Sequence, residues 1–397
     1  MKTIKASRLI FLFSLAYMVS YLTRINYSAV ISAIEASTGF SKQLLSMALT
    51  GSFITYGAGQ IFSGILGDRF SPKKLLLIGL GTTVLMNILI TFCTSPWAMA
   101  GIWSINGLAQ AFMWPPIVRL MTALLTKDEY TTGVVKVSWG SSIGTIIIYI
   151  LAPVIITIAG WKGVFFFSAI CGIIMIFLWQ IYCPEIDLIE KTNEQSPVST
   201  KAKVFTPVFF IMACAIVLCG MLRDGVAAWT PSLISESFNL SNASGILSGA
   251  LLPVFGMICY EVALILYRKR FKNPIVCAGI IFLAGALSSL ILNCALNKSS
   301  ILSVLSIALL NGSMYGVNLM FTGILPSFYA KTGRVSTVSG ILNSFVYIGS
   351  ALSTYGIAVL TESFGWSVTI WVWLGLAVLG AIISFAVATP WKTGLEK

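Results

Sequence analysis

Two arginines are the residues whose type and placement point most directly to chemistry. Arg24 and Arg223 each lie deep inside a long apolar run, in the contexts YLTR and GMLR. A guanidinium surrounded by hydrocarbon is costly, so such a side chain is expected to face a wet cavity or a partner. The acidic residues within the apolar runs are Asp224 and Glu261. Side chains of adjacent helix residues point in different directions, so Asp224 is expected to point away from Arg223. Glu261 lies near the end of its run. Two guanidiniums without good carboxylate partners predict an anion site.

The composition indicates that membrane helices position these arginines. Of the 397 residues, 57% are hydrophobic and 10% are charged, whereas a soluble domain is about 25% charged. Twelve apolar segments can each cross about 30 Å of hydrocarbon as a helix, which predicts an all-α integral membrane protein and excludes a soluble enzyme. The segments are residues 9–34, 43–66, 75–95, 97–125, 133–158, 164–183, 205–229, 243–266, 274–296, 300–327, 337–361 and 366–389.

A polar stretch divides these segments into six and six. We expect a six-helix bundle over residues 1–183, a cytoplasmic linker over 184–204, and a second bundle with a short tail over 205–397. Eighteen of the 25 Lys and Arg residues fall on the side of the N-terminus, and three fall in the opposite loops. This asymmetry predicts a multi-pass protein of the cell (inner) membrane with both termini in the cytoplasm.

The two halves also resemble each other in sequence. Arg24 and Arg223 are 199 residues apart, whereas SSIGTIIIY around Gly144 and VYIGSALST around Gly349 are 205 apart. A Gly-Trp pair at 160–161 recurs at 365–366 with the same offset of 205. Duplicated six-helix halves with a site at their interface are typical of secondary transporters that work by alternating access.

Several classes of chemistry find no support in the sequence. The chain has no histidine, and its eight cysteines form no CxxC pair, so we expect neither a metal site nor a disulfide framework. No P-loop, haem motif or catalytic triad is present, which argues against an enzyme, an ATP-driven pump or a cofactor. The net charge of +12 is explained by orientation in the lipid bilayer and not by nucleic acid, and we expect a monomer.

A second motif lies between the second and third apolar segments, at residues 64–74 with the sequence GILGDRFSPKK. Gly64 and Gly67 permit close approach of helices, and Asp68 can cap a neighbouring helix or pair with a basic group. The motif resembles the cytoplasmic-loop signature of the major facilitator superfamily. This resemblance implies a gating role for Gly64, Gly67, Asp68 and Arg69, and we assign Arg119, near the end of its segment, to salt bridges of the same gate.

Nearly the whole chain resembles the organophosphate–phosphate antiporters of that superfamily. The resemblance is strongest in YMVSYLTR at 17–24, in NGLAQAFMWPP at 106–116 and in LRDGVAAWTP at 222–231. It implies a fold of 12 transmembrane helices in two pseudo-symmetric halves, with one arginine from each half at the substrate phosphoryl group. It also implies that the cavity is lined by Tyr17, Tyr21, Tyr56, Gln110 and Tyr347.

The chain departs from the family at several cavity positions. Gln60 replaces a lysine found in some members, and Ser141 stands nearest to a histidine of others. Ile25 and Ala228 occupy the places of a lysine and an aspartate that some members carry together. We therefore expect Gln60 and Ser141 to offer neutral hydrogen-bonding groups and the affinity for phosphate to be weaker.

The leading functional hypothesis is exchange of a small organic anion, a phosphate ester, for inorganic phosphate. An empty site would leave two like charges facing each other, which opposes net uniport. A proton-coupled symporter of a carboxylate such as a sugar acid is the alternative, with Asp224 and Glu261 as possible proton sites. A membrane sensor of external sugar phosphate is an alternative of another class.

Overall fold

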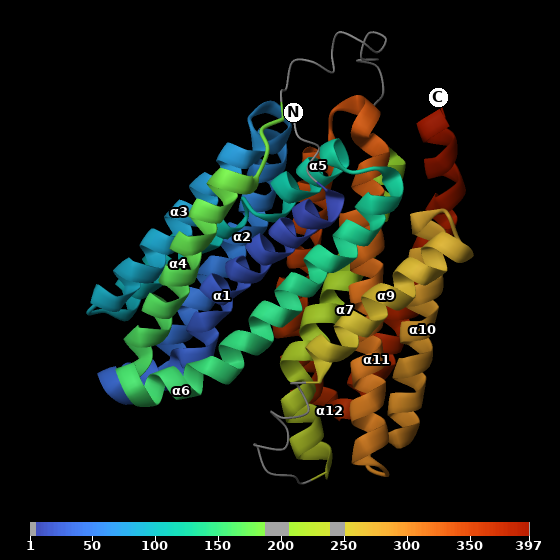
Figure 1. Ribbon diagram of the computed structural model, residues 1–397. Helices are drawn as coiled ribbons and strands as arrows, with labels where there is room; N and C mark the ends of the chain where they lie inside the picture. Colours follow the sequence, from blue (N-terminus) through green and yellow to red (C-terminus); the bar gives the residue numbers. More distant parts are fainter. Residues whose placement is uncertain (1–4, 187–205, 239–250, 397) are drawn as a thin grey trace. The chain divides into compact units, whose positions relative to one another are not determined.

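The computed structural model describes residues 5–186, 206–238 and 251–396, and helices are the regular secondary structure throughout these ranges (Figure 1). The prediction of an all-α fold is confirmed. Nearly all of the predicted linker, and the first residues of the predicted segment 243–266, lie outside the described residues. Eight of the described helical stretches are long and apolar enough to cross a membrane.

The first half of the chain forms α1 (Ala6–Thr38), α2 (Lys42–Arg69), α3 (Pro72–Leu89) with a 3-10 turn at Ile90–Phe92, α4 (Pro96–Gln110), α5 (Trp114–Leu124) and α6 (Lys127–Tyr182). Short polar side chains begin most of these helices. The hydroxyls of Ser41, Ser71, Ser95 and Thr126 each accept a hydrogen bond from a backbone N–H of the first turn. These caps satisfy donors that have no partner inside the helix.

One of the predicted segments is interrupted where no interruption was expected. The segment predicted at 97–125 is two helices, because α4 ends at Gln110 and α5 begins at Trp114. Pro115 and Pro116 lie in the first turn of α5. A backbone N–H in this turn has no acceptor inside the helix, so a proline there costs no helical hydrogen bond. Under the label α6 two helices meet at Gly160, which has non-helical dihedral angles, between the predicted segments 133–158 and 164–183. The φ of 66° at this residue favours glycine.

The second half repeats this arrangement. It forms α7 (Pro207–Phe238), α9 (Leu252–Lys269), α10 (Pro274–Ala295), α11 (Ser300–Asn318) and α12 (Val335–Glu396), with a π-helical turn at Leu319–Ile324 and a 3-10 stretch at Leu325–Thr332 between α11 and α12. Under the label α12 two helices meet at Gly365, which has non-helical dihedral angles with a φ of 75°. Gly160 and Gly365 are the first residues of the two Gly-Trp pairs, so the same residue makes the same turn in both halves.

The chain divides into two compact units. The first comprises Met1–Ser199 together with Pro326–Ser344, and the second comprises Thr200–Leu325 with Phe345–Lys397. In the first unit α1 packs along α6, and α2 packs along α4 (Figure 1). In the second unit α11 packs against α7, α9 and α10. The beginning of α12 therefore belongs to the first unit, although it follows the second half of the helices in sequence.

Equivalent glycines bring helices together in each unit. A Cβ atom on Gly144 of α6 would lie 2.5 Å from the carbonyl oxygen of Met18 on α1. A Cβ atom on Gly349 of α12 would collide in the same way with the carbonyl oxygen of Val217 on α7. The two glycines are 205 residues apart and the two carbonyls 199 apart, which matches the offsets in the sequence. These paired contacts support a duplicated origin of the halves.

Candidate functional site

Arg24 lies among aromatic rings of the first unit. The residue is 7% exposed, and its guanidinium carbon lies 3.9 Å from the centroid of the Tyr56 ring on α2. The rings of Tyr21 and Phe53 lie 5.7 and 5.9 Å from the same atom. Aromatic faces attract a cation, so these three rings stabilise the guanidinium. Tyr17 extends this aromatic lining, with its ring centroid 5.3 Å from that of Tyr21.

The backbone next to Arg24 is fixed by buried amides. The carbonyl oxygen of Thr23 accepts hydrogen bonds from the amide nitrogens of Asn87 on α3, at 3.1 Å, and Asn106 on α4, at 3.2 Å. Gln110 donates its amide to the Thr23 hydroxyl at 2.9 Å. Two helices, α3 and α4, thus determine the position of α1 at the residue before the arginine. Gln110, predicted to line the cavity, is engaged in this network and is 2% exposed.

Arg223 has a different environment in the second unit, and one prediction about it was wrong. Its Nε donates to Oδ1 of Asp224 at 2.6 Å, and its Nη2 donates to Oδ2 at 2.8 Å. We expected no good pairing because adjacent Cβ atoms on a helix diverge. The arginine side chain has four rotatable bonds and bends sideways far enough to form a bidentate pair with its neighbour. Arg223 therefore has a carboxylate partner. The prediction that an empty site would hold two facing like charges, which was the argument against net uniport, is no longer supported.

Residues of α11 and α12 surround this pair within the second unit. The Asn311 amide donates to the carbonyl oxygen of Arg223 at 2.5 Å, and the Tyr315 ring centroid lies 5.8 Å from the guanidinium carbon. Ser350 on α12 donates its hydroxyl to Oδ2 of Asp224. Tyr347, one turn earlier on α12, is half-buried and close enough to interact electrostatically with Arg223. Tyr347 is thus near Arg223.

The predicted neutral cavity groups contact the protein backbone. Gln60 is fully buried, and its amide donates to the carbonyl oxygen of Ala111 at 3.4 Å. Ser141 is 6% exposed and donates to the carbonyl oxygen of Ser138, one turn earlier on α6. Glu261 is half-buried on α9. The structure therefore does not bring Gln60 or Ser141 into a direct hydrogen bond with Arg24.

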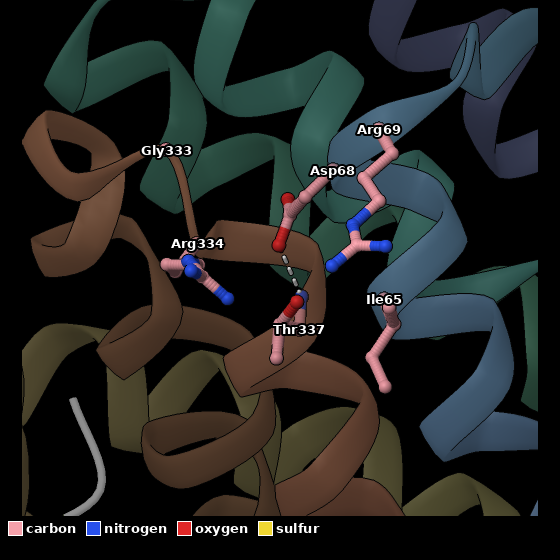
Figure 2. A pocket seen from close by; sticks show the side chains of 6 residues that line it. All are labelled: Ile65, Asp68, Arg69, Gly333, Arg334 and Thr337. Carbon is pink, nitrogen blue, oxygen red and sulfur yellow. Dashed lines mark hydrogen bonds between the residues drawn. The ribbon is translucent and has the colours of Figure 1, made fainter.

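The loop motif at residues 64–74 meets the beginning of α12 inside the first unit. Oδ1 of Asp68 accepts a hydrogen bond from the backbone N–H of Ser336 at 2.9 Å. Oδ2 accepts one from the backbone N–H of Thr337 at 2.8 Å (Figure 2). A Cβ atom on Gly64 would lie 2.8 Å from the Ser336 carbonyl oxygen, and one on Gly67 would overlap the Ser336 hydroxyl. Both glycines are therefore required for this close approach, and Asp68 caps the first turn of α12.

Basic residues surround the Asp68 carboxylate. Arg119 on α5 lies 3.9 Å from Oδ1 of Asp68 and donates to the carbonyl oxygen of Gly67. Arg69 and Arg334 line a cavity of about 190 Å³ beside Asp68, together with Ile65, Gly333 and Thr337 (Figure 2). Asp68 lies beyond the predicted apolar segment 43–66. Burial raises the pKa of its carboxyl, whereas the hydrogen bonds from Thr337 and Ser336 and the charge of Arg119 act in the opposite direction.

Two asparagines beside the arginines were not predicted from the sequence. Asn106 and Asn311 are 205 residues apart, and each begins an Asn-Gly pair. Asn106 donates to the carbonyl before Arg24, and Asn311 donates to the carbonyl of Arg223. A search for further residues at the offset of 205 would have found them. They tie the arginine-bearing helix of each unit to the fourth or tenth apolar segment.

The chain is similar to known proteins in family, sequence and fold. Residues 13–354 match the model of the Major Facilitator Superfamily. A solved structure of the proton:xylose symporter XylE aligns with a TM-score of 0.75 at 14% identity, covering 96% of this chain and 96% of that one, which shows the same fold.

Three curated relatives align over most of their length. A glycerol-3-phosphate transporter of Bacillus subtilis is 27% identical, covering 96% of this chain and 91% of the relative. A probable hexose phosphate transport protein of Chlamydia muridarum is 25% identical, covering 88% and 84%. The membrane sensor protein UhpC of Salmonella typhimurium is 24% identical, covering 93% and 86%.

Proposed function

Because the chain belongs to the Major Facilitator Superfamily, a family of multi-pass membrane transporters and not of enzymes, we propose that it carries a small organic anion bearing a phosphoryl group. The main observation in support of this proposal is that Arg24 and Arg223 are buried at corresponding positions of two repeated halves. Both guanidiniums present planar donors suited to phosphate oxygens. The names of the relatives, which specify glycerol 3-phosphate and hexose phosphate, support the same substrate class.

We propose that both arginines bind the same anion and that transport proceeds by exchange with inorganic phosphate. Arg24 contributes a guanidinium that contacts Tyr56 and Tyr21, and Arg223 contributes one that is paired with Asp224 in this structure. Binding of the anion by residues from both halves lowers the barrier to alternating access. The coupling to phosphate rests on the family and on the paired arginines.

We also propose that the loop at residues 64–74 is a gate on the cytoplasmic side. The capping of α12 by Asp68, together with the Arg119 pair, stabilises one of the alternating conformations. Rupture of these interactions would accompany the opposite conformation. The loop thus acts on the equilibrium between conformations, and not on the affinity of the anion site.

Uptake into proteoliposomes loaded with inorganic phosphate tests the proposal. Labelled glycerol 3-phosphate or hexose 6-phosphate should enter only when phosphate is present inside, because each inward step requires an outward step of another anion. A sugar acid such as gluconate serves as the comparison. Gluconate uptake driven by a proton gradient into phosphate-free vesicles would favour the proton-coupled carboxylate symporter instead.

The sensor hypothesis has one specific observation in its favour, the similarity to a relative named as a membrane sensor. A sensor would bind the phosphate ester without exchanging it at a useful rate. Measurement of binding by the purified protein beside exchange in vesicles separates the two functions. Saturable binding with no exchange above that of protein-free vesicles would contradict transport and support sensing.

A further inference from the structure

The two arginines differ in one respect that the repeat makes visible. The residue after Arg24 is Ile25, whereas the residue after Arg223 is Asp224. In the second unit the carboxylate occupies both the Nε and the Nη2 donors of the guanidinium, at 2.6 and 2.8 Å. These are the side-on donors that would otherwise bind two oxygens of a phosphoryl group. Asp224 thus takes the place that an anionic substrate requires.

We propose that Asp224 is a tethered competitor for Arg223, which the incoming anion displaces, and that its displacement couples anion binding to uptake of a proton at Asp224. This inference rests on the proposed function. Asp224 is a positioning and specificity-determining residue in this scheme, since it controls when the arginine is available.

Exposure and hydrogen bonding make the displacement feasible. The side chain of Arg223 is 11% exposed, whereas that of Asp224 is 34% exposed, so the carboxylate is more accessible to solvent than the guanidinium. Ser350, which donates to Asp224, can also donate to the carbonyl oxygen of Val346 on its own helix at 3.0 Å. If the carboxylate leaves, the hydroxyl retains an acceptor, and no buried donor is left without a partner.

Charge balance supplies the reason for the proton. A phosphate monoester carries close to two negative charges at pH 7 and above, because its second pKa is about 6. The Arg223–Asp224 pair contributes no net charge. When the ester replaces the carboxylate and a proton from water forms an O–H bond on Asp224, the guanidinium of Arg223 faces the dianion beside a neutral carboxylic acid. Without that proton, a carboxylate and a dianion would be close together in a medium of low dielectric constant.

The other titratable groups that the described residues place near Asp224 or its arginine include one thiol and two phenols, those of Cys219 on the same helix, Tyr315 on α11 and Tyr347 on α12. Thiols and phenols ordinarily lose their protons above about pH 8. Between pH 6 and 8, a change of protonation linked to anion binding is therefore assigned to Asp224.

Calorimetric titration of the purified full-length protein with glycerol 3-phosphate tests this assignment. At pH 8 the ester is already a dianion, so protons taken up on binding come to the protein. The binding enthalpy, measured in buffers with different protonation enthalpies, gives the number of protons taken up per ester bound. The wild type should take up close to one proton per ester bound, and its affinity should rise about tenfold from pH 8 to pH 7.

Asp224→Asn keeps the shape of the side chain and removes its charge. The variant should take up no proton and should bind the ester at least tenfold more tightly than the wild type at pH 8. Asp224→Ile, which copies the residue after Arg24, provides a second variant with the same expectation should the first not fold. Glu236→Gln is the matched control, because Glu236 lies on the same helix but accepts a hydrogen bond from Trp366, and it should behave as the wild type.

The outcomes separate this inference from the proposed function. Binding of the ester with no proton uptake by the wild type, or with undiminished uptake by Asp224→Asn, overturns the role of Asp224 and leaves the substrate class intact. Loss of uptake in Glu261→Gln instead would move the proton to α9 and also overturn it. Failure of the wild type and of both Asp224 variants to bind any phosphate ester overturns both proposals.

Discussion

Individual side chains separate what the sequence could predict from what it could not. Arg24 and Arg223 stand out in the sequence because charge inside an apolar run needs an explanation. The pairing of Arg223 with Asp224 could not be predicted from the sequence. It depends on the rotamers of a long side chain and not on the directions of the Cβ atoms. Likewise, Gln60 and Ser141 have the right types for a cavity, but their donors are used by nearby backbone carbonyls.

The aromatic contact of Arg24 leads to a prediction at the same scale. Tyr56→Leu removes the ring that lies 3.9 Å from the guanidinium and should weaken binding of glycerol 3-phosphate. A cation–π contact is worth about 0.5–2 kcal/mol, which corresponds to a loss of affinity between a few-fold and about thirtyfold. Tyr56→Phe retains the ring and is the control, so it should bind within about twofold of the wild type. Equal losses in the two variants would assign the effect to the hydroxyl group.

At the scale of helices, the sequence predicts more than it does for side chains. Periodic apolar runs located the helices, and the Gly-Trp pairs mark the turns at Gly160 and Gly365. The break between α4 and α5 was not predicted, since prolines within a membrane helix are compatible with either a kink or an end. The start of α12 joins the first unit through Asp68, a contact between residues 268 positions apart. The motif predicts that Asp68 contacts a neighbouring helix, but it does not identify which of several helices that is.

The cap on α12 leads to a prediction at the scale of that contact. Asp68→Asn replaces one acceptor oxygen by an amide that faces a backbone N–H, so the cap and the attraction to Arg119 both weaken. Exchange of phosphate esters in vesicles should slow at least tenfold, while equilibrium affinity in detergent should change by less than threefold, if, as proposed, the loop biases conformations. Asp128→Asn, an exposed acidic residue at the start of α6, is the control. A parallel fall in affinity and rate would move Asp68 from the gate to the anion site.

For the whole molecule, the central claim is that two repeated halves each contribute one arginine to a single anion site. The offsets of 199 and 205 residues connect the arginines, the packing glycines and the asparagines that fix the backbone beside each arginine. This repetition was partly visible in the sequence. The difference between the halves, a carboxylate beside one arginine and not directly after the other, was visible too, but its consequence depends on geometry.

The most direct test is a double-mutant cycle on the arginines, with phosphate-driven exchange of glycerol 3-phosphate as the measurement. Arg24→Lys and Arg223→Lys keep the charge but lose the planar fork, and each should lower exchange by at least tenfold, which corresponds to about 1.4 kcal/mol. If both arginines bind one anion, the double variant should be little worse than either single variant, because the first loss already removes the shared interaction. Normal exchange in both single variants, or strictly multiplicative losses in the double variant, would contradict a single anion site built from both halves.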